Sequence, residues 1–140
     1  MAEPAPSRLL IYTDGAARGN PGPAGLGAFI RDAETGRVVA ELARFLGIRT
    51  NNYAEWTAVE VALEEALRLG ASYVDLRMDS ELVARQISGR YRVKHADLRP
   101  IHAHVMAMLG ELRGYTVAHV PRELNKDADR LSNIAVDERR

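Results

Sequence analysis

The order of strand-like and helix-like segments restricts the possible folds of this 140-residue chain more than any single motif does. Short apolar or alternating runs bounded by Gly, Pro and polar residues predict strands, and apolar residues three and four apart predict helices. The Gly/Pro-rich stretch 15–23 predicts a loop, and Glu34-Thr35-Gly36 predicts a hairpin turn. Strands are predicted at about 8–14, 25–31, 37–45, 73–79 and 115–120, and helices at about 52–69, 81–88, 97–113 and 125–138.

The resulting order, β-β-β-α-β-α-α-β-α, predicts an α/β fold in which a hairpin lies beside β-α-β crossovers. Because such crossovers are right-handed and place helices over the sheet, we expect the first and fourth strands to be central and parallel. Open sheets of this kind bind ligands beyond the carboxyl ends of their strands. The length predicts one domain over residues 1–140, with residues 1–7 as a loose N-terminal tail.

Composition narrows the class of protein. A hydrophobic share of 46% with 27% charged residues is typical of globular proteins, and no run approaches the ~20 apolar residues of a membrane span. The absence of cysteine excludes disulfides and Cys-based zinc sites, and it fits a cytoplasmic protein. The 19 basic and 19 acidic residues balance, so nucleic acid would have to bind through local patches. We expect a monomer with no membrane partner.

Four carboxylates occupy positions where folding alone does not favour an acid: Asp14, Glu55, Asp79 and Asp129. Asp14 and Asp79 end the apolar runs of two predicted central strands. Glu55 lies on the apolar side of the helix predicted at about 52–69. An acid in the first turn of a helix gains at most ~1 kcal/mol from the helix dipole, and this gain does not require the apolar side. Four acids in one place would repel each other and lose solvation, so the cluster predicts a divalent-metal site.

Several alternatives remain open at this point. Asp14 and Asp79 are also plausible as residues that begin turns, and periodicity does not separate Asp129 from its neighbour Asp127. His102 and His104 are two apart on a helix and therefore do not form a metal-binding pair with each other. His119 ends the last strand, and if that strand is parallel to the first, His119 lies at the acids' end of the sheet as a proton carrier or as a structural residue.

The motifs around these acids resemble ribonuclease H of type 1, in its compact archaeal-like branch that lacks a basic protrusion. The resemblance covers about residues 8–136. Its matching stretches are Tyr12-Thr13-Asp14-Gly15 with Gly19-Asn20-Pro21-Gly22-Pro23, Thr50-Asn51-Asn52-Tyr53-Ala54-Glu55, Met78-Asp79-Ser80, and His119-Val120-Pro121-Arg122-Glu123-Leu124-Asn125 followed by Ala128-Asp129-Arg130-Leu131.

The resemblance implies a five-stranded mixed sheet in the order 3-2-1-4-5 with strand 2 antiparallel, flanked by helices. It implies an endonuclease that hydrolyses the RNA strand of RNA–DNA hybrids and leaves 5′-phosphate and 3′-hydroxyl ends. It also implies that two Mg²⁺ ions, with Mn²⁺ as a possible substitute, are held by four acids, and it selects Asp129 over Asp127. The hard oxygen ligands agree with this assignment. The four implied metal ligands are Asp14, Glu55, Asp79 and Asp129.

Substrate contacts are implied for the groove that reads the 2′-hydroxyl and for a DNA-strand phosphate. Thr50, Asn51 and Asn52 have helix capping as an alternative role. The basic residues between Ser88 and Arg99, with Arg85 and His95, either partly replace the missing protrusion or form a solvated charge run. The implied substrate-binding residues are Gly15, Asn20, Thr50, Asn51, Asn52, Arg90, Arg92 and Lys94.

Two further positions bear on catalysis. Glu81 stands where many members of the family carry a Gln that touches RNA, so an acid there is expected to weaken or alter that contact. His119 and Arg122 are both candidates for the group that aids product release, and the archaeal-like pattern favours Arg122.

Two other classes of function compete with a nuclease. A binding module that has lost its chemistry is disfavoured because all four acids are present. A phospho-accepting receiver domain usually needs a lysine beyond a later strand, whereas the two lysines here, Lys94 and Lys126, do not closely follow a predicted strand.

Overall fold

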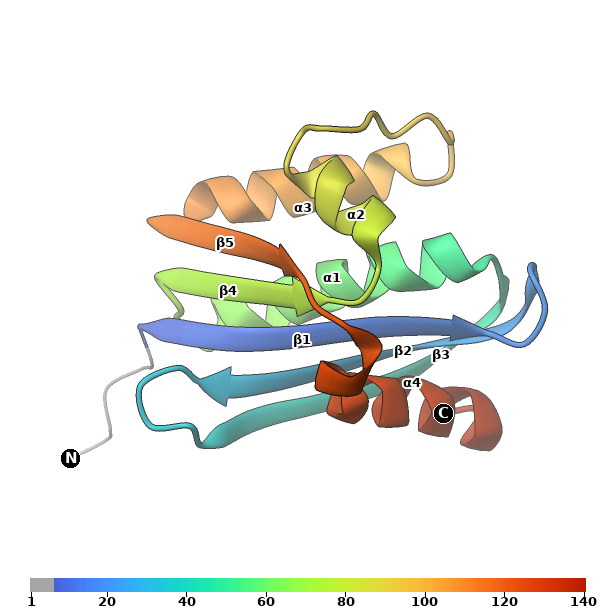
Figure 1. The fold of residues 1–140 in the computed structure, drawn as a ribbon, viewed down its shortest axis with the longest axis horizontal. Helices are drawn as coiled ribbons and strands as arrows, with labels where there is room; N and C mark the ends of the chain where they lie inside the picture. Colours follow the sequence, from blue (N-terminus) through green and yellow to red (C-terminus); the bar gives the residue numbers. More distant parts are fainter. Residues whose placement is uncertain (1–6) are drawn as a thin grey trace.

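The computed structural model describes residues 7–140 and shows an α/β fold built on one five-stranded sheet (Figure 1). The strand order is β3-β2-β1-β4-β5. β1 and β2 are antiparallel, as are β2 and β3, whereas β4 runs parallel to both β1 and β5. The fold class, the strand order and the antiparallel second strand are therefore confirmed. The strands are β1 Arg8–Ala17, β2 Gly22–Asp32, β3 Val38–Arg49, β4 Tyr73–Met78 and β5 Gly114–His119.

The helices begin and end within about two residues of the predicted bounds. Thr50 caps the first helix by accepting a hydrogen bond from the Tyr53 amide, and Ser80 caps the second by accepting one from the Val83 amide. A short 3₁₀ helix at Arg122–Leu124 was not predicted. Of the predicted tail at residues 1–7, all but Ser7 lies outside the described residues. The helices are α1 Asn51–Arg68, α2 Glu81–Ile87, α3 Arg99–Glu111 and α4 Lys126–Glu138.

The predicted end of the first strand is wrong, and the reason lies in its two neighbours. β1 pairs with β4 only as far as Thr13 opposite Met78, but it continues beside β2 to Ala17. Asp14 therefore lies inside a strand and just beyond the last parallel pair. The hairpin with β2 also shortens the predicted loop, because β2 already begins at Gly22.

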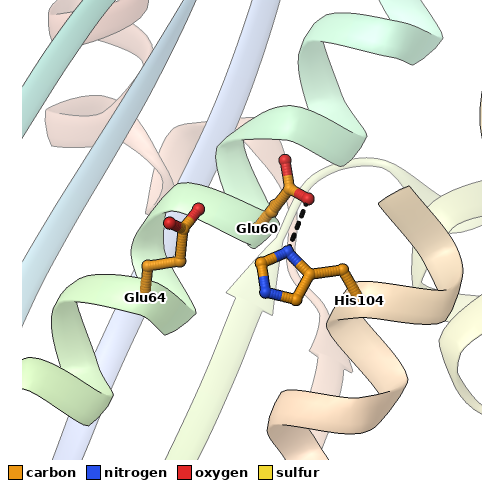
Figure 2. Close-up of side chains that lie close together, drawn as sticks. All are labelled: Glu60, Glu64 and His104. Atoms are coloured by element: carbon orange, nitrogen blue, oxygen red, sulfur yellow. Dashed lines mark hydrogen bonds and ion pairs between the residues drawn. The ribbon is translucent and has the colours of Figure 1, made fainter. Parts of the chain in front are cut away.

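The main core lies between the sheet and the helices α1, α2 and α3. Trp56 of α1 is fully buried there, and its Nε1 donates a hydrogen bond to Oε1 of Gln86, 2.9 Å away. On the surface of this helix layer, Nδ1 of His104 on α3 lies 2.8 Å from Oε2 of Glu60 on α1 (Figure 2). Across the described residues, no helix combines the length and apolar content needed to cross a membrane.

α4 covers the opposite face of the sheet, and a glycine lets it approach closely. Side chains alternate along β2, so Leu26 packs beneath α1 whereas Gly25 and Gly27 face α4. A Cβ on Gly27 would lie 2.2 Å from the carbonyl oxygen of Ala128, which no side chain tolerates. Direct contact between the backbones of β2 and α4 thus sets the distance between Asp129 and the sheet.

Candidate functional site

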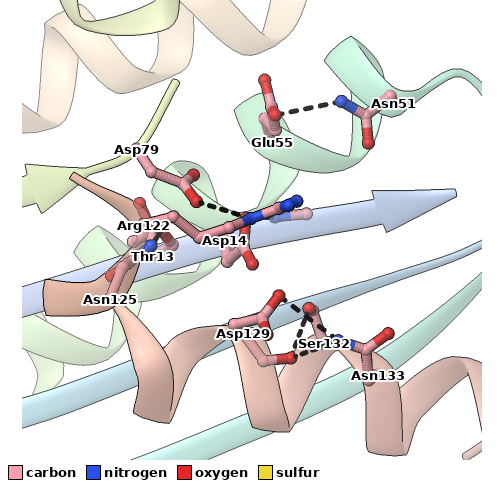
Figure 3. A network of polar contacts seen from close by, with 11 residues as sticks. Thr13, Asp14, Asn51, Glu55, Asp79, Arg122, Asn125, Asp129, Ser132 and Asn133 are labelled. Atoms are coloured by element: carbon pink, nitrogen blue, oxygen red, sulfur yellow. Dashed lines mark hydrogen bonds and ion pairs between the residues drawn. The ribbon is translucent and has the colours of Figure 1, made fainter. Parts of the chain in front are cut away.

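Three of the four predicted acids converge at one end of the sheet. Asp14, Glu55 and Asp79 each offer a carboxylate oxygen, and these three oxygens all lie within 4.8 Å of one another. Figure 3 shows them approaching from β1, from the first turn of α1 and from the segment that follows β4. Residues 41 and 24 positions apart in the chain thus form one compact anionic cluster.

The local structure explains how these side chains meet. Asp14 and Asp79 are the residues that follow the last parallel pair, Thr13 and Met78, so they lie side by side where the pairing of β1 with β4 ends. Gly15 then allows the first turn of α1 to approach β1, because a Cβ at this position would lie 2.3 Å from the backbone nitrogen of Glu55. The glycine therefore brings Glu55 to the two aspartates.

The structure separates Asp129 from Asp127. Asp129 is half-buried on α4 and lies close enough to Asp14 to raise its pKa, although it lies outside the compact group of three. Asp127 is exposed, and its carboxylate lies 3.8 Å from Arg130. Asp129 is thus the member of this pair that faces the cluster.

Burial and mutual repulsion dominate the electrostatics of the cluster. Burial, followed by the charge of Asp79, the hydrogen bond with Asp129 and the charges of Asp129 and Glu55, raises the pKa of Asp14 to about 8. Burial also raises the pKa of Glu55, and the charge of Asp79 adds to this, whereas hydrogen bonds from Ser80 and Asn51 oppose it. Without a cation, the cluster therefore retains a proton close to neutral pH.

The donor chemistry fits a hard divalent cation. All four acids supply carboxylate oxygens, which suit Mg²⁺ and Mn²⁺. Arg122 is the one cationic side chain within 4.0 Å of these acids among residues 7–140, with its Nε 3.9 Å from Oδ2 of Asp79. Its side chain is 82% exposed, so it offsets little of the buried charge. Asp14, Glu55, Asp79 and Asp129 are the residues that could hold such ions.

Amide side chains position the cluster. Asn51 Nδ2 donates to Oε1 of Glu55 at 3.1 Å, and Oδ1 of Asn20 accepts from the Asn51 backbone amide at 3.0 Å. Asn125 is 1% exposed, and its Nδ2 donates to the Thr13 carbonyl oxygen at 2.9 Å. Asn125 thus ties the start of α4 to β1 beside Asp14. Sequence reasoning treated it only as part of a motif, because nothing local indicates that its partner is 112 positions away.

An extended groove crosses the cluster. Its central hollow, of about 250 Å³, shares His119 with a second hollow of about 430 Å³, and shares Asp14 and Arg122 with a third of about 390 Å³. The outer hollows bring in residues that sequence reasoning did not select for the site. Arg18 and Asn133 line one end, and Nη2 of Arg18 donates to Oδ1 of Asn133 at 2.8 Å. The one available signal was the position of Asn133 one helical turn beyond Asp129.

Some of the remaining predicted contact residues line the groove, and the rest do not. Gly15, Asn51 and Arg90 line the groove, as do His119 and Arg122. Thr50 acts as a helix cap. Oδ1 of Asn52 is buried without a hydrogen-bond partner in the described part of the chain. Arg92 and Lys94 are exposed and do not belong to the residues that line these hollows.

Glu81 lies in the groove, but its charge is partly compensated. Its carboxylate lies 2.5 Å from Nη2 of Arg85, one turn later on α2. This ion pair reduces the repulsion that an isolated acid at this position would exert on a phosphate.

Comparison with known proteins finds relatives over nearly the whole chain. A family model described as "Reverse transcriptase-like" matches residues 12–135. The chain is 40% identical to Ribonuclease HI of Halobacterium salinarum over 131 residues, which cover 94% of this chain and 65% of the relative. It is 42% identical to a bifunctional protein of Mycobacterium tuberculosis over 130 residues, which cover 93% of this chain. The chain spans only 36% of the length of that mycobacterial relative.

Solved structures agree with these relatives. The N-terminal RNase H domain of the mycobacterial protein superposes with a TM-score of 0.90 at 42% identity, covering 93% of this chain and 99% of that one. LC11-RNase H1, solved in complex with an RNA/DNA hybrid, superposes with a TM-score of 0.87 at 42% identity, covering 94% and 98% of the two chains.

Proposed function

Because the chain belongs to the type 1 ribonuclease H family, we propose that it is an endoribonuclease that hydrolyses the RNA strand of RNA–DNA hybrids. The observation that carries this proposal is the group of three carboxylates within 4.8 Å of one another on the floor of an open groove. The structural relative LC11-RNase H1, which was solved with a bound RNA/DNA hybrid, supports the choice of substrate. The single-domain organisation, the monomeric state and the cytoplasmic location stay predictions from the sequence.

The proposed chemistry depends on two divalent cations, Mg²⁺ or Mn²⁺, held by Asp14, Glu55, Asp79 and Asp129. When bound, such ions activate a water for attack on the scissile phosphate and stabilise the leaving 3′ oxygen, which gives 5′-phosphate and 3′-hydroxyl products. The side chains supply the negative charge and its geometry. Asn51 orients Glu55, and Asn125 fixes α4, which carries Asp129, to β1. Glu55 and Asp129 therefore do not have to be ordered when substrate binds.

The residues of the groove support a proposal for how a duplex is positioned. We propose that Asn20, Asn51 and the Gly15 backbone read the 2′-hydroxyls, because all three lie at the junction of the β1–β2 turn and α1. We propose that Arg18 at one end of the groove and Arg90 at the other contact phosphates. Thr50 and Asn52 are proposed as neighbouring contacts on the same turn of α1.

Purified protein is expected to cut a labelled hybrid in the presence of Mg²⁺ or Mn²⁺, and to leave single-stranded RNA, duplex RNA and duplex DNA intact. Chelation with EDTA should stop the reaction, because the four acids cannot activate a water without a bound cation. Gel analysis of the four substrates with and without metal measures this selectivity. Tight binding of the hybrid without cleavage in either cation would instead indicate a binding module.

Replacing Arg122 with Ala is expected to lower the multiple-turnover rate roughly tenfold, an effect of about 1.4 kcal/mol. Arg122 lies at the rim of the groove beside Asp79 and is largely exposed, a position suited to drawing the product phosphate away. The rate in a single turnover should change much less, because release does not limit that measurement.

The comparison variants are His119→Ala and Arg113→Ala. His119 lines the same groove. If the multiple-turnover rate falls more in His119→Ala than in Arg122→Ala, His119 is the residue that aids product release. Arg113 precedes β5 at the other end of that strand, and its removal should leave both rates unchanged.

A further inference from the structure

A second cluster of possible metal ligands lies on the outer surface of the helix layer. Glu60 and Glu64 of α1 and His104 of α3 each offer one ligand atom, and these atoms all lie within 4.8 Å of one another. Figure 2 shows the two carboxylates and the imidazole ring directed toward a common space between the helices. None of the three residues belongs to the carboxylate cluster or to the groove around it.

The core of the protein holds these donors in place. Glu60 and Glu64 are four residues apart on one helix, so they lie on the same face of α1. α3 packs against this helix, and His102, two residues before His104, makes an edge-to-face contact with the buried ring of Trp56 at a centroid distance of 5.4 Å. The site is therefore built on two packed helices, not on a mobile loop.

The charges at this cluster are poorly compensated. Several other acids on the helices pair with arginine, as Glu65 does with Arg68 and Glu81 with Arg85. Glu60 has His104 as its one polar side-chain partner within residues 7–140, and Glu64 has none there. Two neighbouring carboxylates therefore lie beside one imidazole that bonds only Glu60 of the pair, in a chain that contains 17 arginines.

We propose that Glu60, Glu64 and His104 form a binding site for a divalent transition metal, with Zn²⁺ as the ion it selects. Imidazole nitrogen combined with carboxylate oxygen suits Zn²⁺, whereas the all-oxygen cluster at the end of the sheet suits Mg²⁺ and Mn²⁺. The Nδ1 to Oε2 contact of 2.8 Å needs a proton between the two atoms, and the ion takes the place of that proton. Three protein ligands leave one position of a tetrahedral ion to water.

Such an ion links α1 to α3. α1 also carries Glu55, so the metal stabilises the helix that supplies one acid of the other cluster. The proposal does not depend on the nuclease activity, because it rests on a different set of side chains.

Zinc uptake is measured by calorimetry on the full chain carrying Asp14→Asn and Asp79→Asn, which weaken binding at the other cluster. We expect one Zn²⁺ per chain, with an affinity that falls at least about tenfold in each of His104→Gln, Glu60→Gln and Glu64→Gln. His95→Gln, in an exposed loop, and Glu111→Gln, exposed on α3, are the matched controls and should bind as the parent does. Equal uptake in His104→Gln and the parent would overturn the proposal.

Two further measurements distinguish a site with three ligands from binding by His104 alone. Co²⁺ in place of Zn²⁺ should give a visible absorption spectrum that each of the three substitutions changes. Excess Zn²⁺ should also raise the Tm of the parent by several degrees and that of His104→Gln by much less, because binding to the native state alone stabilises it. If the substitution of His104 abolishes uptake while both glutamate variants bind as the parent does, the three-ligand site is wrong.

Discussion

Asp14→Asn is expected to reduce hybrid cleavage by at least about a thousandfold, a loss of roughly 4 kcal/mol of transition-state stabilisation. Asp14 is the most buried of the four acids, at 7% exposed, and it lies between Glu55, Asp79 and Asp129. An amide keeps the shape of the side chain but removes the charge that holds a cation. Cleavage is measured in single-turnover assays at saturating enzyme and Mg²⁺, so weaker binding of the hybrid does not enter.

The same substitution should stabilise the protein when metal is absent. Burial and the neighbouring charges raise the pKa of Asp14 from 3.8 to about 8, so the folded state binds a proton that the unfolded state has lost. This contribution to stability is complete below pH 4 and disappears as the pH rises through about 8. In EDTA at pH 8 or above, Asp14→Asn should therefore be about 2 kcal/mol more stable than the parent, which raises Tm by roughly 4–8 °C.

Asp127→Asn is the matched control for both measurements. It makes the same chemical change on α4, but at an exposed residue whose partner is Arg130. It should cleave normally and show the parental dependence of Tm on pH. Added Mg²⁺ should remove the loss of stability at high pH in the parent and have little effect on Asp14→Asn. Rapid cleavage by Asp14→Asn would exclude this residue from the metal site.

The convergence of Asp14 and Asp79 could be predicted from the sequence because both follow apolar runs of parallel strands. That argument needs only strand direction, and the register of Thr13 with Met78 agrees with it. Helix caps could be predicted in part. Ser80 lies directly before its helix, whereas Thr50, Asn51 and Asn52 all remained candidates for the first helix. The side chains of Thr50 and Ser80 each accept a hydrogen bond from an amide three residues later. A helix cap depends only on residues that are close in the sequence, so a local sequence pattern indicates it.

Other parts of the site depend on contacts between distant segments. Periodicity alone did not separate Asp129 from Asp127, because that choice is made by the packing of α4 against Gly25 and Gly27 of β2. The role of Asn125 requires a partner on β1, and the pairing of Glu60 with His104 requires two helices 44 positions apart. The end of β1 was misplaced for the same reason, since β2 extends it beyond the point where β4 stops.

Gly15→Ala is expected to reduce cleavage about a hundredfold, because misplacing a catalytic group by about 1 Å has effects of this size. The new Cβ would lie 2.3 Å from the Glu55 nitrogen and 2.4 Å from the Ala54 carbonyl carbon, so the first turn of α1 must move away from β1. That movement carries Glu55 away from Asp14 and Asp79. The strain should also lower stability by about 1–3 kcal/mol.

Gly110→Ala provides the control for this change. Gly110 is inside α3, and a Cβ there meets nothing within 4 Å. Alanine favours a helix over glycine, so this variant should gain about 0.5–1 kcal/mol and cleave at the parental rate. Cleavage rates and thermal unfolding of the two variants are measured side by side. Parental cleavage by Gly15→Ala together with parental stability would show that α1 need not approach β1 this closely. Parental cleavage with lowered stability would show instead that the contact supports the fold but does not position Glu55.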